Sequence, residues 1–177
     1  MSFSKLPFRV WLGLGGNIND PIVSMAKAIR ILDQRSDTHI DAVSPVYRTP
    51  PWGKTDQAWF HNTCVAIDTS LEPLRLIKTC LEVERSLKRV RLERWGPRII
   101  DIDILAMQDA AGRGIVMQDA VLELPHPRMQ DRAFVLIPLA DIAPSLEISG
   151  KTVGEWVAAC DRTGIEKART DAGWWRE

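Results

Sequence analysis

Isoleucine and aspartate alternate in residues 99–105, which read Ile-Ile-Asp-Ile-Asp-Ile-Leu. Isoleucine favours β-structure because its branched side chain packs well on a pleated surface. Successive side chains of a strand point to opposite faces, so the isoleucines at even positions share one face. The stretch therefore predicts a β-strand whose buried face carries Ile100, Ile102 and Ile104.

Asp101 and Asp103 share the other face of this predicted strand. Residues two apart on one face lie roughly 7 Å apart, and two carboxylates at that spacing repel unless a cation lies between them or water solvates them. Magnesium prefers oxygen ligands and is usually held by one or two carboxylates, with waters and substrate phosphates completing its shell. The pair is therefore a candidate magnesium site; the alternative is a pair of solvated surface carboxylates.

An arginine-rich stretch runs directly into this strand. Residues 85–98 contain one acid, Glu93, against these basic residues: Arg85, Lys88, Arg89, Arg91, Arg94 and Arg98. Guanidinium groups match phosphate oxygens in paired hydrogen bonds and do not deprotonate. A cationic loop beside a carboxylate pair suggests polyphosphate chemistry, in which arginines neutralise charge that develops in the transition state. The alternatives are a solvated charged surface or a contact with nucleic acid.

Composition limits the class of protein. The chain has 177 residues, 45% hydrophobic and 26% charged, which suits a single globular domain. Its formal net charge is zero, whereas general nucleic-acid-binding proteins are basic, so we expect no nucleic-acid partner. The three cysteines are too widely spaced for a zinc site or a disulfide framework. Apolar runs are too short to span a membrane and the N-terminus lacks a secretory pattern, so we expect a cytoplasmic protein without a membrane partner. We also expect a monomer, although no pattern in the sequence sets the oligomeric state.

Predicted strands and helices alternate along the rest of the chain. Further strands are expected at residues 8–14, 38–47 and 60–69, with Pro45 marking an edge or a bulge and a glycine-rich turn at Gly15 and Gly16. Helices are expected to begin at three polar residues that favour the N-cap, each followed by a proline or an acid: Asp20 with Pro21, Ser70 with Pro73, and Thr152 with Glu155.

The C-terminal part has no clear period after residue 162. We therefore divide the chain into one domain over residues 1–161 and a tail over residues 162–177, to which the sequence assigns no role. Trp174 and Trp175 suggest that the tail docks on the domain.

Five residues outside the aspartate strand are candidates for a binding site. Trp52 and Trp59 lie in or beside a proline-rich loop, where they either cap the core or form an aromatic wall for a flat ligand. Asn62 is either a satisfied core amide or a group that reads a ligand. Glu84 falls on the buried arc of its helix, where a carboxylate needs a partner; we favour a role at the site over a structural ion pair. His126 is held in a rigid loop between two prolines; the alternative to a role at the site is an ordinary surface histidine. By contrast, we expect His61 to be exposed.

Three stretches carry a family resemblance: Tyr-Arg-Thr-Pro-Pro at 47–51, Arg-Trp-Gly-Pro-Arg-Ile-Ile-Asp-Ile-Asp-Ile at 94–104, and Pro-His at 125–126 followed by Arg-Ala-Phe at 132–134. With them, residues 8–144 resemble the 6-hydroxymethyl-7,8-dihydropterin pyrophosphokinase family of folate biosynthesis. The resemblance implies a single-domain α+β fold of the ferredoxin-like type, with an antiparallel sheet packed by helices. It also implies transfer of the diphosphate of ATP to the hydroxymethyl group of the pterin, with release of AMP.

The resemblance also implies a set of site residues. In the family two magnesium ions bridge the phosphates and two aspartates, here Asp101 and Asp103, and two arginines, here Arg89 and Arg98, match the catalytic cations. The residues that match the pterin-binding set are Thr49, Pro50, Trp52, Phe60, Asn62, Glu84, Trp95 and Phe134. The residues that match the ATP-binding set are Leu81, Arg89, Arg91, Trp95, Arg98, Ile104, His126 and Arg132. Two other functions stay open: a metal-dependent nucleotide phosphohydrolase and a nucleic-acid-binding module.

Overall fold

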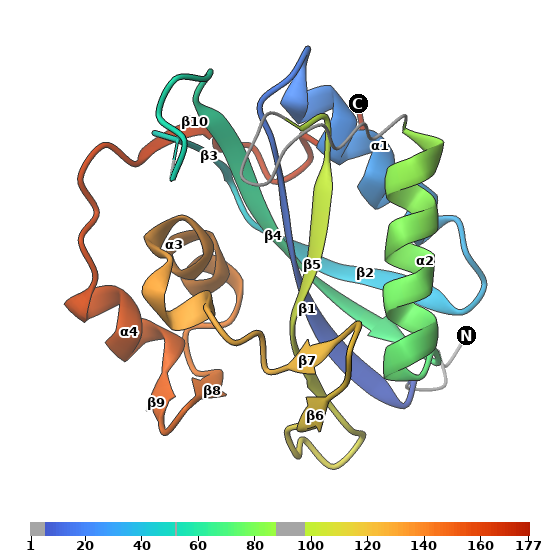
Figure 1. Cartoon of the computed structure of the whole chain (residues 1–177). Helices are drawn as coiled ribbons and strands as arrows, with labels where there is room; N and C mark the ends of the chain where they lie inside the picture. Colours follow the sequence, from blue (N-terminus) through green and yellow to red (C-terminus); the bar gives the residue numbers. More distant parts are fainter. Residues whose placement is uncertain (1–5, 52, 88–97) are drawn as a thin grey trace.

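An antiparallel sheet with helices on both faces forms the body of the chain (Figure 1). The structure, a computed structural model, describes residues 6–51, 53–87 and 98–177. The strands of the main sheet are β1 (Phe8–Gly16), β2 (Thr38–Val43), β3 (Val46–Thr49), β4 (Phe60–Thr69), β5 (Asp101–Gln108) and β10 (Glu166–Arg169). The α-helices are α1 (Pro21–Asp33), α2 (Pro73–Ser86), α3 (Ala133–Ile142) and α4 (Val153–Ala159). The short elements are β6 (Met117–Gln118), β7 (Glu123–Leu124), a 3-10 helix (Met129–Asp131), β8 (Glu147–Ile148) and β9 (Lys151–Thr152).

The strand order confirms the predicted fold class. The path across the sheet is β10-β3-β4-β1-β5, with β2 also paired to β4, and every pairing is antiparallel. Along the chain the main elements up to β5 follow as strand, helix, three strands (of which β2 and β3 are short and both pair with β4), helix and strand, and β1 lies inside the sheet next to β5. This is the ferredoxin-like arrangement.

Each face of the sheet has its own hydrophobic core. One core lies between the sheet and helices α1 and α2, and it contains the three alternating isoleucines of β5 as predicted: Ile100, Ile102 and Ile104. The other lies against α3 and α4 and includes Cys64 and Ala66 of β4. Asp101 and Asp103 therefore belong to the α3 face of β5, because side chains alternate along a strand.

The predicted strand over residues 38–47 is divided into β2 and β3, both paired with β4. The division falls at Ser44 and Pro45. The Ser44 N–H donates to the Cys64 carbonyl at 2.9 Å, and the Ser44 hydroxyl accepts from the Cys64 N–H at 2.9 Å. The serine hydroxyl thus supplies an acceptor for a β4 N–H where the strand is interrupted, next to a proline that offers no N–H of its own.

Two of the three predicted helix starts are confirmed and one is wrong. Asp20 caps α1 by accepting from the Val23 N–H, and Thr152 forms a capping box with Glu155 at α4. Helix α2 instead begins at Pro73 after Glu72, which makes no side-chain capping bond. Ser70 does not cap it, because the Ser70 N–H donates to the Asp37 carbonyl and ties the residue to the start of β2.

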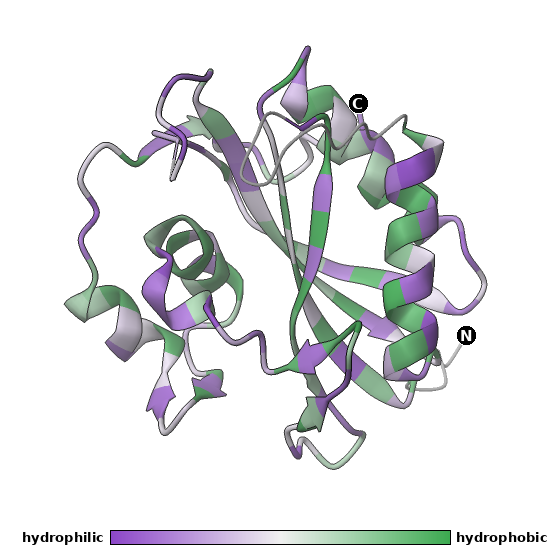
Figure 2. Cartoon of the chain, viewed as in Figure 1, coloured by the Kyte–Doolittle hydropathy of each residue, from purple (hydrophilic) through white to green (hydrophobic). Residues whose placement is uncertain are grey.

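Two further features differ from the sequence-based expectations. His61 is half-buried, not exposed, and burial, followed by the charge of Arg48, lowers its pKa. Helix α3 was not predicted because its sequence is apolar on almost every side and contains Pro138, so it shows no helical period (Figure 2).

The C-terminal tail joins both the sheet and a core. Strand β10 pairs with β3, and Trp174 and Trp175 are buried in the core on the α1 side. The Trp174 indole donates to the Ser44 carbonyl at 3.1 Å, and Arg30 donates to the Trp175 carbonyl at 2.8 Å. The tail therefore docks as its tryptophans suggest, whereas the division into a domain and a separate tail stays a prediction. Within the described ranges, no helix combines the length and the apolar character needed to cross a membrane.

Candidate active site

Glycines of β1 lie opposite both aspartates of β5. Asp101 pairs with Gly15, and Asp103 pairs with Gly13, so no side chain of β1 stands beside either carboxylate. The predicted turn at Gly15 and Gly16 is wrong, because β1 continues through Gly16 and pairs on both sides. A Cβ on Gly15 would lie 2.5 Å from Oδ1 of Asn62, so the missing side chain makes room for that amide. The carboxylates and Asn62 thus lie along one strip of the sheet, which β1 crosses without side chains at Gly13 and Gly15.

Arg98 lies beside this strip and contacts two of the predicted site residues. Its guanidinium donates to the Asp101 carboxylate and lies 5.6 Å from the ring centroid of Phe60. Both ends of this ion pair are only partly exposed, at 20% for Arg98 and 13% for Asp101. The arginine therefore joins the carboxylate pair to the aromatic end of β4.

Asn17 is a residue of the site that the sequence analysis did not single out. Its backbone N–H donates to the Arg98 carbonyl at 2.9 Å, and its Oδ1 accepts from the Arg98 N–H at 2.9 Å. Its Nδ2 donates to Gln57 at 3.0 Å and to the Ala58 carbonyl at 2.9 Å. A buried asparagine thus fastens the backbone of Arg98 to the loop before β4. The partners of Asn17 lie 40 or more positions away in the sequence. The only local signal of its role was therefore its position directly after two glycines.

The predicted pterin-binding residues gather at the ends of β3 and β4. Asn62 donates to the Thr49 hydroxyl at 2.8 Å, and both side chains are buried. Thr49 pairs with Phe60, which begins β4. Phe134 begins α3 on the same face of the sheet, with the Arg132 guanidinium 5.9 Å from its ring centroid.

Glu84 supports the aspartate strand from its other face. Its carboxylate is 1% exposed and accepts from the Ile102 N–H at 2.7 Å. Ile102 stands between the two aspartates on β5, so Glu84 fixes the backbone that carries them. Its predicted contact with the pterin stays a prediction.

Positive charge is concentrated around the aspartates. The pKa of Arg132 is lowered, chiefly by burial and further by the charges of Arg128 and Arg98, whereas Asp103 and Asp101 act to raise it. Because the charges of Arg128 and Arg98 act on Arg132, an added anion would be stabilised here. The sequence analysis did not name Arg128 as a site residue; its position two residues after His126 was the available signal.

His126 belongs to the same cluster. Burial first, and then the charges of Arg132 and Arg128, lower its pKa to about 4. Its Nδ1 accepts from the Arg128 N–H at 3.2 Å, so the neutral ring carries its proton on Nε2. At neutral pH His126 therefore presents an uncharged hydrogen-bond donor, not a cation.

The low pKa of His126 predicts a loss of stability in acid. An unfolded histidine has a pKa of about 6.5, so between about pH 6.5 and pH 4 the unfolded state binds more protons than the folded state. The free energy of unfolding should therefore fall as pH falls through this window. His126→Gln should flatten that fall in urea titrations at several pH values, whereas His39→Gln, at a side chain 60% exposed, should leave most of it. An equal slope in the wild type and His126→Gln would contradict this assignment.

The other predicted site residues are less directly placed. Ile104 is 2% exposed in the core, so only its backbone is available to a ligand, and Leu81 is half-buried on α2. Trp52, Arg89, Arg91 and Trp95 lie outside the described residues. Among the described residues, no group of three or more histidines, cysteines, aspartates or glutamates could hold a metal ion. A metal there would rest on the two aspartates and on ligands from outside the protein.

Comparisons with known proteins identify the family of the chain. Residues 11–144 match the family described as 7,8-dihydro-6-hydroxymethylpterin-pyrophosphokinase (HPPK). A Methylorubrum extorquens protein named 2-amino-4-hydroxy-6-hydroxymethyldihydropteridine pyrophosphokinase is 50% identical over 159 residues, covering 90% of this chain and 98% of that protein. A Pseudomonas aeruginosa protein of the same name is 40% identical over 160 residues, covering 90% of this chain and 96% of that protein.

Solved structures share the fold at much lower identity. The wild-type HPPK-DHPS of Plasmodium falciparum matches with a TM-score of 0.66 and 16% identity, over 89% of this chain and 42% of that one. A triple mutant of that protein with pteroate matches with a TM-score of 0.67 and 15% identity, over 94% of this chain and 47% of that one. The chain thus spans less than half the length of these structures but nearly all of its bacterial relatives. On the family match and the bacterial identities, the chain belongs to the 7,8-dihydro-6-hydroxymethylpterin-pyrophosphokinase family.

Proposed function

We propose that the chain transfers the diphosphate of ATP to the hydroxymethyl group of 6-hydroxymethyl-7,8-dihydropterin and releases AMP. The names of the bacterial relatives support this activity, because each is aligned over nearly its whole length. The observation that carries the proposal is the juxtaposition of Arg98, Asp101 and Phe60 on one face of the sheet. It brings a cation, a carboxylate and an aromatic ring to the point where a phosphate and a flat acceptor would meet.

Magnesium is the metal that this site suits. Asp101 and Asp103 offer two hard oxygen ligands on one face of β5, and magnesium is usually held by one or two carboxylates with waters and phosphates completing its shell. Asp101 and Asp103 would hold the metal, and we expect two ions. When bound, magnesium supplies charge neutralisation to the phosphates.

The protein side chains then supply positioning and charge, not covalent chemistry. Arg98 lies against the carboxylate pair, Arg132 and the neutral His126 are available to phosphate oxygens, and Arg89 and Arg91 are expected to join them. Diphosphoryl transfer needs neutralisation of negative charge more than a protein nucleophile. Consistent with this, burial raises the pKa of the Cys80 thiol to about 12 and that of Cys64 higher still, so both stay protonated at neutral pH.

The pterin is expected to bind at the ends of β3 and β4. Phe60 and Phe134 offer two aromatic faces for a flat bicycle, since stacked aromatic groups attract beyond their buried area. Asn62, held by Thr49, offers an amide to the hydrogen-bonding edge of the pterin. Backbone groups of Pro50, with Trp52 and Trp95, complete the predicted pocket.

The first test is the dependence of AMP formation on the pterin. Incubation with ATP, magnesium and 6-hydroxymethyl-7,8-dihydropterin should yield AMP in equal amount to the pterin consumed, and AMP should not form without the pterin. Release of phosphate from ATP alone would favour a phosphohydrolase. Salt-sensitive binding of RNA or DNA without AMP formation would favour a nucleic-acid-binding module. The cytoplasmic location and the monomeric state stay predictions.

A further inference from the structure

A glycine of the C-terminal tail lies directly against the predicted pterin pocket. Gly164 has a left-handed φ of 77°, and a Cβ added there would lie 3.3 Å from Cγ and 3.5 Å from Cδ of Pro50. A contact of 3.3 Å is tighter than nine in ten real Cβ contacts, so a larger residue would displace one of the two segments. Pro50 follows Thr49, so this displacement would act on the loop that is predicted to read the pterin.

The turn that carries Gly164 is held on both sides. Before it, the Asp161 carboxylate accepts from the Thr163 N–H at 2.9 Å and from the Thr163 hydroxyl at 2.6 Å. Across it, the Ile165 N–H donates to the Arg162 carbonyl at 3.2 Å. After it, β10 enters the sheet with Lys167 paired to Tyr47. These bonds keep the shape of the turn, and the pairing of β10 with β3 ties the end of the turn to the sheet beside Pro50.

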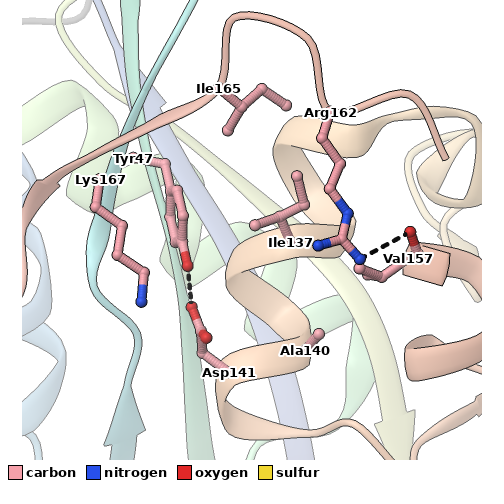
Figure 3. A pocket seen from close by; sticks show the side chains of 8 residues that line it. All are labelled: Tyr47, Ile137, Ala140, Asp141, Val157, Arg162, Ile165 and Lys167. Carbon is pink, nitrogen blue, oxygen red and sulfur yellow. Dashed lines mark hydrogen bonds between the residues drawn. The ribbon is translucent and has the colours of Figure 1, made fainter.

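The tail contacts β3 more closely than it contacts α3. Figure 3 shows a pocket between them, with Ile165 and Lys167 of the tail and Tyr47 of β3 around one part and Ile137 of α3 opposite. Its volume is 430 Å³, about that of a small-molecule pocket. The Tyr47 hydroxyl spans from β3 to donate to Asp141 of α3. On the other side of this pocket the segment leading into β10 lies against β3 and, at Gly164, against Pro50.

We propose that Gly164 is a positioning residue for the pterin pocket. Its missing side chain sets how closely the tail packs on Pro50, and thereby where the backbone at Thr49 and Pro50 meets the pterin. This inference rests on the proposed function. The segment lies outside the stretch that matches the family, residues 11–144, so it adds a determinant that the family match does not include. The described residues expected to bind ATP are on α2, at β5 and before α3, and none belongs to the loop that Gly164 contacts, so we expect the effect to be confined to the pterin.

The test compares two glycines with the same backbone but different surroundings. Gly112 has a φ of 78°, and a Cβ there would meet nothing within 4 Å. Gly112→Ala therefore introduces the same unfavourable φ as Gly164→Ala but no contact with a neighbouring segment. Calorimetry with a non-hydrolysable ATP analogue and magnesium should show the Kd for 6-hydroxymethyl-7,8-dihydropterin about fivefold to tenfold higher in Gly164→Ala than in Gly112→Ala. The Kd for the ATP analogue should be the same in both variants.

Two outcomes would overturn the inference. One is an equal pterin Kd in both alanine variants while the wild type binds the pterin; the other is an equal loss of pterin and ATP affinity in Gly164→Ala. Pro50→Ala supplies a second test, because it removes the ring atoms that the new Cβ would meet. In that background Gly164→Ala should have no further effect beyond that of Gly112→Ala, and an undiminished effect would also overturn the inference. Failure of the wild type to bind the pterin at all would count instead against the proposed function.

Discussion

Replacing Arg98 with alanine is expected to lower turnover by about a thousandfold or more, the range found when a transition-state arginine is lost. Arg98 donates to Asp101 beside the predicted phosphate site, so its charge lies where negative charge would develop during transfer. An interaction that strengthens in the transition state lowers kcat when it is removed, with a smaller change in ground-state affinity. Single-turnover kinetics and calorimetric titration with an ATP analogue would measure the two effects separately.

Two control variants limit the interpretation of that result. Arg98→Lys keeps the charge but loses the planar fork, so it should recover part of the turnover. Arg113→Ala removes an arginine that also forms an ion pair with an aspartate, at 2.7 Å from Asp109. The Arg113 side chain is 81% exposed and lies in the turn after β5. This replacement should leave turnover unchanged. If Arg98→Ala retained turnover within about tenfold of the wild type, Arg98 would not act in the transition state.

Replacing Asp101 and Asp103 together with asparagine should abolish the dependence of ATP binding on magnesium. Asparagine keeps the shape of each side chain but removes the charge that a divalent cation needs. Turnover should fall by at least about a thousandfold, because metal ions supply several kcal/mol of charge stabilisation to phosphoryl transfer. Titrations with an ATP analogue, with magnesium or with a chelator, would measure the change.

Asp109→Asn provides the matched control for the aspartate variants. Asp109 is also an aspartate in an ion pair, but it lies in the turn after β5, away from the glycines that face Asp101 and Asp103. Its replacement should leave magnesium dependence intact. Magnesium-dependent ATP affinity that survives in the double asparagine variant would rule out the carboxylate pair as the metal site.

Local patterns were enough to predict the centre of the site. The alternation of isoleucine and aspartate predicted which face of β5 is buried, and the cores confirm it. The ion pair between Arg98 and Asp101 was not part of that pattern, because Arg98 lies before β5 and Asn17 fastens its backbone. The capping residues of α1 and α4 were also predictable, since they act within a single turn.

Features that depend on distant partners could not be predicted from local patterns. The structural role of Gly13 and Gly15 depends on the strands on either side of β1, and these strands come from later parts of the chain. Asn17 binds groups of two separate loops, and Ser70 is held by a carbonyl of another loop. Helix α3 shows no period because the sheet and α4 bury it on several sides. Long-range packing in each case overrode or concealed the local signal.

The most direct test of the proposed activity follows the two outer phosphorus atoms of ATP. The chain would be incubated with magnesium, 6-hydroxymethyl-7,8-dihydropterin and ATP labelled at either the β or the γ phosphorus, and the products would be separated. The account predicts that both labels appear in the pterin product and that AMP carries neither. Transfer of the γ label alone with formation of ADP, or recovery of the label as inorganic phosphate, would contradict it.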